Sequence, residues 1–111
     1  IVAMKEDAKN VYVHPVLIDY IVELARMTRQ QDNVSIGVSP RGTLGMLNAA
    51  RAYAYVAGRD YVVPEDIKIL APVVWAHRIV LQTGYMNMAN KEQIVEHVVN
   101  NTAVPTEDWK R

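Results

Sequence analysis

The chain has 111 residues, half of them hydrophobic, and its 12 basic residues balance its 12 acidic ones. This length suits one modest domain with its own core, and zero net charge disfavours a duplex nucleic-acid binder or an electrostatic membrane anchor. Because the chain has no cysteine, it can form neither a disulfide nor a zinc–thiolate site.

The N-terminal stretch IVAMKEDAKN lacks the apolar core of a signal peptide. No apolar run approaches the roughly 20 residues that span a bilayer. We therefore expect a soluble, cytoplasmic piece of a longer protein, with no membrane segment.

The first predicted helix runs from about His14 to Gln30, with a proline at its start. Apolar residues recur at three- and four-residue spacing and form one stripe, which consists of Leu17, Tyr20, Ile21, Leu24 and Thr28.

The second predicted helix runs from Pro40 to about Ala57, with Ser39 as its N-cap. Gly58 ends it because glycine tolerates a left-handed backbone. Its expected inner face comprises Leu44, Leu47, Ala50, Ala54 and Ala57, widened by Met46, Ala49 and Tyr53.

The third predicted helix starts at Pro64, and Glu65 and Asp66 lie in its first turn, where the helix dipole favours acids. Its stripe comprises Ile67, Leu70, Val74, His77 and Leu81. Pro72 lies inside this helix and predicts a kink or break there. A final amphipathic helix is expected from about Asn90 to Asn101.

Two short β-prone runs, 11–13 and 61–63, each precede a proline-led helix and are candidates for a two-stranded ribbon. Together these elements predict an all-α fold, a small bundle of about four helices with little strand. Residues 1–104 form the predicted domain, and residues 105–111 a C-terminal linker or tail.

The residues themselves suggest no catalytic machinery. No pair among His14, His77 and His97 has the i, i+4 spacing of a helical metal site, and His77 falls on an apolar stripe, which favours a core histidine. There is no GxxxxGK[ST] phosphate loop. We expect this chain alone to be inactive.

Arg41 is the unusual residue. In GVSPRGTLGML it follows Ser39 and Pro40, so it lies in a first helical turn, where the dipole disfavours a cation by ~0.3–1 kcal/mol. One interpretation is a solvated surface arginine. The other is an anion site, because helix N-termini offer unpaired N–H groups and a guanidinium suits phosphate. Gly42 and Gly45 keep this surface thin and would admit a ligand.

The order of these motifs resembles a known family. DYIVELARMTR, then GVSPRGTLGMLNAARAYAYVAGRDYVVPEDIK, then LAPVVWAHRIVL is similar to the C-terminal lid domain of MoxR-type AAA+ ATPases over nearly the whole chain. The family commonly has Thr or Ser before the proline of the PED stretch. Here that residue is Val63, which removes a capping hydroxyl worth ~1 kcal/mol.

The resemblance implies that the lid closes over ATP and Mg²⁺ bound mainly by an AAA+ core domain of the same chain. Arg41 resembles the second sensor, which reaches the terminal phosphates, and Pro40 and Leu44 flank it near ribose or adenine, although core packing explains Leu44 equally well. Family members are ATPases that form rings, usually hexamers, and remodel or mature partner proteins. They often act with proteins that carry von Willebrand factor A domains.

The sequence is compatible with several alternatives. The helices alone also fit a protein-interaction module with no nucleotide role, whereas zero net charge disfavours a helix-turn-helix nucleic-acid binder. Arg78 could face the core domain or the next subunit, or form a salt bridge within the lid. Arg59 and Asp60 are expected to fix the turn into the run 61–63.

Overall fold

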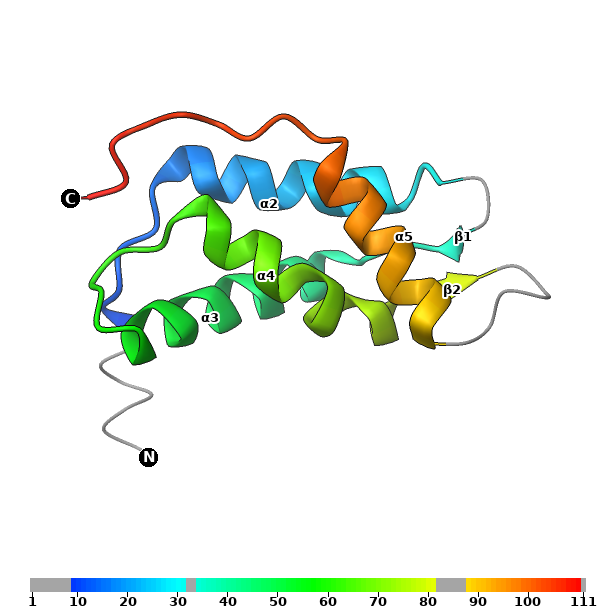
Figure 1. The fold of residues 1–111 in the computed structure, drawn as a ribbon, viewed down its shortest axis with the longest axis horizontal. Helices are drawn as coiled ribbons and strands as arrows, with labels where there is room; N and C mark the ends of the chain where they lie inside the picture. The colour runs from blue at the N-terminus through cyan, green and yellow to red at the C-terminus, as the bar shows by residue number, and fades with distance from the viewer. Residues whose placement is uncertain (1–8, 32–33, 82–87, 111) are drawn as a thin grey trace.

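The computed structural model describes residues 9–31, 34–81 and 88–110. Four helices form a bundle (Figure 1): α2 (Pro15–Thr28), α3 (Pro40–Val56), α4 (Pro64–Trp75) and α5 (Met88–Asn100). A 3-10 turn, η1 (Ala76–Arg78), and two short strands, β1 (Val34–Ile36) and β2 (Val80–Leu81), complete it. The predicted all-α bundle of about four helices is confirmed.

Three of the helices begin at the predicted prolines, and each start is secured by a nearby acceptor. His14 Nδ1 accepts the Val16 N–H at 3.1 Å, and Ser39 Oγ accepts the Gly42 N–H at 3.3 Å. Val63 offers no such acceptor, as expected, but the Asp66 carboxylate accepts the Val63 N–H at 3.0 Å. The acid in the first turn of α4 therefore secures this helix start.

The core lies where the four helices meet. α4 packs against both α3 and α5, and α2 also contacts α3 and α5. Every residue of the stripe predicted for α2 is buried. Trp75 is the largest of the fully buried side chains, which also include Leu17, Ile21, Leu24, Met46, Ile67, Val95 and Val98.

The predicted inner face of α3 was partly wrong. Its buried residues are Gly42, Met46, Ala50 and Ala54, at strict four-residue spacing. Leu44 is 57% exposed and Ala57 is also exposed. Since each residue turns a helix by about 100°, Leu44 lies on the side of α3 opposite the face that positions 42 and 46 bury.

The prediction for the third helix was wrong at its C-terminal end. α4 continues through Pro72 to Trp75, because the buried Ala71 and Trp75 on either side hold the helix against the core despite the missing N–H. The chain then tightens into η1 and extends into β2. His77 is consequently exposed rather than a core histidine.

The strand pairing differs from the expected ribbon. The runs 11–13 and 61–63 meet only in a single parallel bridge between Tyr12 and Tyr61. The true ribbon is antiparallel and joins β1 to β2, with Ile36 opposite Val80. Strands of three and two residues carry too little periodicity for the sequence to reveal them.

The C-terminal tail runs back along the bundle beside α2 (Figure 1). The Trp109 ring meets the His14 ring edge-on, with centroids 5.7 Å apart, and packs against the hydrophobic core. Lys110 Nζ lies 6.0 Å from the centre of the Tyr61 ring. That residues 105–111 form a linker to a further part of the protein remains a prediction.

Tyr20 gives a prediction for alkaline stability. Its hydroxyl is buried and has no hydrogen-bond partner among the described residues. Burial, together with the charge of Glu65, raises the pKa of Tyr20 above its usual value of 10.0. The folded state therefore keeps this proton at a pH where the unfolded chain releases it, so the stability that it contributes is complete below about pH 10 and is lost as the pH rises through the folded pKa.

We expect Tyr20→Phe to change the free energy of unfolding at pH 7 by less than about 1 kcal/mol, since no hydrogen bond is lost. Between pH 9 and 11 the variant should lose less stability than the parent chain in urea titrations. Tyr53→Phe, at an exposed tyrosine, is the matched control for the loss of a tyrosine hydroxyl. Equal slopes for Tyr20→Phe and the parent chain would contradict this account.

Candidate functional site

The start of α3 is held in place by side chains of α2 and its C-cap. Thr28 is fully buried, and its Oγ1 accepts the Val38 N–H at 3.0 Å while it donates to the Ala25 carbonyl at 2.6 Å. Arg29 Nη1 donates to the Val38 carbonyl at 2.6 Å. Both polar groups of Val38, the residue before the N-cap, are thus satisfied by the end of α2 and its cap.

The end of α4 holds the same helix start from the other side. The Trp75 indole N–H donates to the Gly42 carbonyl at 2.9 Å, inside the core. The first turn of α3 is therefore tied to two other helices. The sequence interpretation missed Trp75 and gave Thr28 only a packing role, although a buried indole N–H generally requires an acceptor.

Arg41 lies in this fixed turn and is exposed. Among the described residues, its guanidinium takes part in no hydrogen bond or ion pair, and the first turn of α3 contains no acid. The backbone of Arg41 is thus held in a fixed position, while its guanidinium is free of partners among the described residues. Sequence and structure agree on this placement.

The backbone of this turn has fewer free N–H donors for an anion than the sequence suggested. Pro40 has no N–H, the Gly42 N–H goes to Ser39 Oγ, and the Thr43 N–H goes to the Ser39 carbonyl. Within the described part of the chain, only the Arg41 N–H is left over in the first turn. The attraction for an anion must therefore come mainly from side chains.

The two glycines of the motif have a role that the sequence did not predict. A methyl group on Gly42 would lie 2.7 Å from Val38 Cγ1 and 3.2 Å from Arg78 Cδ. A methyl group on Gly45 would lie 3.5 Å from Arg78 Nη2. The thin surface of α3 is thus already covered by Arg78 and Val38, and it does not form an open space for a ligand.

The other two predicted site residues flank Arg41 on the outside of α3. Pro40 is exposed, and Leu44 is 57% exposed, so core packing does not explain Leu44. An exposed leucine one turn from a free arginine offers an apolar contact beside a cation. The structure therefore brings Pro40, Arg41 and Leu44 together at one helix end.

Arg59 and Asp60 lie at the opposite end of α3. Arg59 forms a bidentate ion pair with Asp66, with N–O distances of 2.8 and 2.6 Å. It also donates to the Tyr61 carbonyl at 3.0 Å. These hydrogen bonds with Asp66 raise the pKa of the Arg59 guanidinium, so Arg59 stays charged. Arg59 fixes the turn into the run 61–63, as expected, through both the Tyr61 carbonyl and Asp66.

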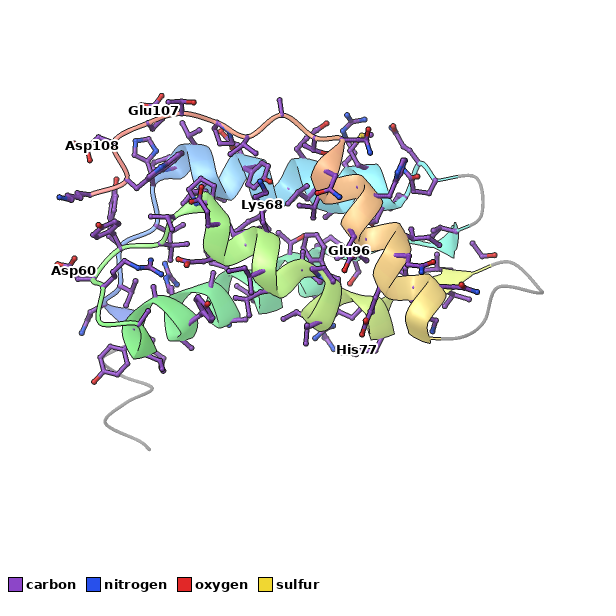
Figure 2. The ribbon with its side chains drawn as sticks, in the orientation of Figure 1. Asp60, Lys68, His77, Glu96, Glu107 and Asp108 are labelled. Carbon is purple, nitrogen blue, oxygen red and sulfur yellow. The ribbon has the colours of Figure 1, made fainter. Side chains whose placement is uncertain are left out.

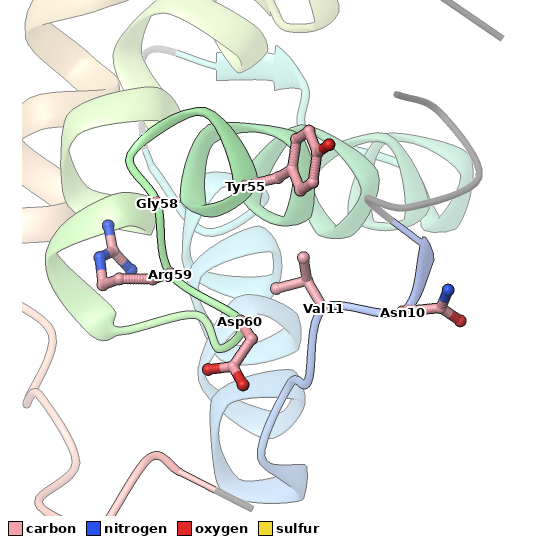
Figure 3. A pocket seen from close by; sticks show the side chains of 6 residues that line it. All are labelled: Asn10, Val11, Tyr55, Gly58, Arg59 and Asp60. Atoms are coloured by element: carbon pink, nitrogen blue, oxygen red, sulfur yellow. The ribbon is translucent and has the colours of Figure 1, made fainter. Parts of the chain in front are cut away.

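An open pocket lies beside this ion pair, lined by Asn10, Val11, Tyr55, Gly58, Arg59 and Asp60 (Figure 3). Gly58 has a φ of 84°, the left-handed conformation predicted for the residue that ends this helix. The pocket is a full helix length away from Arg41, because Gly58 follows the last turn of α3. It therefore does not belong to the site around Arg41.

The described residues contain no group of three His, Cys, Asp or Glu side chains that could hold a metal ion. Figure 2 shows several ionisable side chains, including Asp60, His77 and Glu96, on separate elements. None of the helices in the described ranges has the length and apolar character needed to cross a bilayer.

Comparison with known proteins gives a consistent result. Residues 26–98 match the family described as the AAA lid domain. The chain is 37% identical over 105 residues to the protein YeaC of Bacillus subtilis, and 36% identical over 112 residues to the chaperone MoxR1 of Mycobacterium tuberculosis. These matches cover 94% and 92% of this chain, but only 33% and 30% of the relatives, so the chain spans about a third of their length.

A further relative, the protein MoxR of Methylorubrum extorquens, is 49% identical over 49 residues, which is 44% of this chain and 14% of that protein. The crystal structure of a candidate ATPase from Cytophaga hutchinsonii matches with a TM-score of 0.80 and 27% identity. That match covers 91% of this chain and 34% of the other.

Proposed function

This chain belongs to the AAA lid domain family and is a lid of the MoxR type; from this premise we propose that it senses the phosphates of ATP through Arg41. The ATP would be bound by an AAA+ core domain of the same protein or of a neighbouring subunit. Lid position would then report whether the terminal phosphate is present.

The observation that carries this proposal is the state of Arg41. The start of α3 is held by α2, by its cap Arg29 and by α4. Thr28 accepts the Val38 N–H, Arg29 donates to the Val38 carbonyl, and Trp75 donates to the Gly42 carbonyl. Arg41 projects from that fixed turn with no partner among the described residues and next to the positive end of the helix dipole. A rigid origin and a free guanidinium are what a phosphate-sensing residue requires.

The physical consequence is a difference in affinity between nucleotide states. Arg41 gains most when a terminal phosphate is present and loses that contact after hydrolysis, so the closed lid is favoured only with ATP. A positioned arginine also stabilises the charge that develops during phosphoryl transfer. Pro40 and Leu44, both exposed beside Arg41, would contact the ribose or adenine.

The remaining roles rest on the resemblance. By that resemblance we assign Mg²⁺ and most of the ATP contacts to the AAA+ core domain. The whole protein would hydrolyse ATP as a homo-oligomeric ring, with the hexamer as the expected size. It would use the lid movement for chaperone-like remodelling or maturation of partners, including proteins with von Willebrand factor A domains.

The direct test is ATP turnover by the whole protein with Arg41→Ala. One charge-assisted hydrogen bond is worth about 1.5–3 kcal/mol, so kcat should fall roughly 10- to 100-fold. Arg41→Lys should retain part of the activity, because it keeps the charge but not the planar fork. Arg26→Ala, which removes an exposed arginine paired with Glu23, is the control and should be neutral.

Oligomer size and the thermal unfolding midpoint are measured in parallel to exclude a folding defect. Unchanged turnover by Arg41→Ala, with an unchanged oligomer, would refute the sensor role and leave a protein-interaction module as the better interpretation.

A further inference from the structure

We propose that Arg78 is a second phosphate-contacting arginine, so that the lid approaches the nucleotide with a pair of guanidinium groups and not with Arg41 alone. This inference rests on the proposed function of Arg41. The ligand class is a nucleoside triphosphate, and the atoms contacted are its terminal phosphate oxygens.

The first support is the place of the Arg78 side chain. Its Cδ lies over Gly42 and its Nη2 over Gly45, at 3.2 and 3.5 Å from the positions that their Cβ atoms would occupy. Gly45 lies four residues after Arg41, so both are on one face of α3, one turn apart. The guanidinium of Arg78 therefore lies on the face of α3 from which Arg41 projects.

The second support is the way in which Arg78 is held. It belongs to η1 and follows Trp75 by three residues, and the Trp75 indole donates to the Gly42 carbonyl at 2.9 Å. The end of α4 and the start of α3 are thus joined directly beneath the arginine. Figure 1 shows these two ends at the same side of the bundle, near the β1–β2 ribbon. The aliphatic stem of Arg78 packs on α3, whereas the residue as a whole remains exposed.

The third support is the charge balance. Neither Arg41 nor Arg78 forms an ion pair among the described residues, whereas Arg26 pairs with Glu23 and Arg59 with Asp66. Two cations on one face, beside the positive end of a helix dipole, repel one another. An anion between them would remove this repulsion, and a phosphate chain supplies both the charge and several acceptor oxygens.

The backbone supports the same conclusion. Because Ser39 accepts the Gly42 and Thr43 N–H groups, the helix start can give an anion only the Arg41 N–H in its first turn. A second guanidinium at this position supplies the donors that the backbone does not.

The test compares ATP-like and ADP affinities in the whole protein. The nonhydrolysable analogue AMP-PNP and ADP are titrated by calorimetry against the parent protein and the Arg78→Met, Arg78→Lys and Arg41→Ala variants. Methionine keeps an aliphatic stem over Gly42 but removes the charge, so the fold should survive. Lys68→Ala, which removes a cation from the other end of α4 (Figure 2), is the control.

We expect Arg78→Met to reduce the preference for AMP-PNP over ADP about 10-fold, with partial recovery in Arg78→Lys and no change in Lys68→Ala. A purely structural role would lower the unfolding midpoint and both affinities together without altering their ratio. If Arg41→Ala reduces the ratio and Arg78→Met does not, the role of Arg78 is refuted and the sensor role of Arg41 stands. If neither variant alters the ratio, the proposed function itself fails.

Discussion

Replacing Trp75 by alanine is expected to lower the free energy of unfolding of this chain by about 3–5 kcal/mol. Trp75 is the largest fully buried side chain and packs at the end of α4, so its loss leaves a cavity in the core. The Gly42 carbonyl would also lose the indole N–H that satisfies it. Urea denaturation of the two proteins measures the difference.

Two variants control this experiment. Val73→Ala removes a side chain that is 68% exposed on the same helix, and it should change the stability by less than about 0.5 kcal/mol. Trp75→Phe keeps most of the packing but loses the hydrogen bond, so its cost should be intermediate. A loss of less than about 1 kcal/mol for Trp75→Ala would mean that α4 does not hold the start of α3 as described.

The second large effect is expected for Arg59→Ala. It leaves the Asp66 carboxylate, whose side chain is 3% exposed, without its cation. Breaking a fully buried pair costs about 3–5 kcal/mol, because the remaining charge is uncompensated. Since the Arg59 side chain is 26% exposed, we expect a loss at or below the lower end of that range. The Val63 N–H would be the only described hydrogen-bond donor left to that carboxylate.

A second ion pair in the chain, which is exposed, serves as the control for this experiment. Arg26 and Glu23 form an exposed ion pair, and Arg26→Ala should leave the free energy of unfolding nearly unchanged. The double variant Arg59→Ala/Asp66→Ala should recover part of the loss, since no buried charge remains. If Arg59→Ala is no more harmful than Arg26→Ala, the pair does not stabilise the turn that joins α3 to α4.

The helix starts and the main stripes were predictable because they depend on local chemistry. A proline identifies where α2, α3 and α4 begin, supported by the capping Ser39 at α3 and the first-turn acids at α4. Three- and four-residue spacing identifies the buried face of α2. These signals require no knowledge of the neighbouring helices.

Features that depend on tertiary contacts could not be predicted in this way. The orientation of α3 follows from the small residues Gly42, Ala50 and Ala54 packing in the bundle, although Leu44 is the more hydrophobic residue. The exposure of His77 follows from the change from α4 to η1 three residues after Pro72, which periodicity does not signal. The β1–β2 ribbon joins residues far apart in sequence.

In the candidate site, too, the locally determined features were predictable and the tertiary contacts were not. The sequence placed Arg41 correctly, since Ser39 and Pro40 determine the helix start. It could not place Arg78 on the same face, because that contact joins residues 33 to 36 positions apart, and it misassigned the glycines as space for a ligand. A glycine in a helix indicates a close approach but does not identify the group that approaches.

The central claim is that Arg41 couples lid position to the terminal phosphate, and distance measurement tests it most directly. This chain has no cysteine, so Glu96→Cys on the exposed side of α5 provides a single dye site on the lid. A second dye on the core of the whole protein then reports lid closure by energy transfer. We predict that AMP-PNP, but not ADP, shortens the distance in the parent protein, and that Arg41→Ala abolishes this difference. The same nucleotide-dependent shortening in Arg41→Ala would contradict the account.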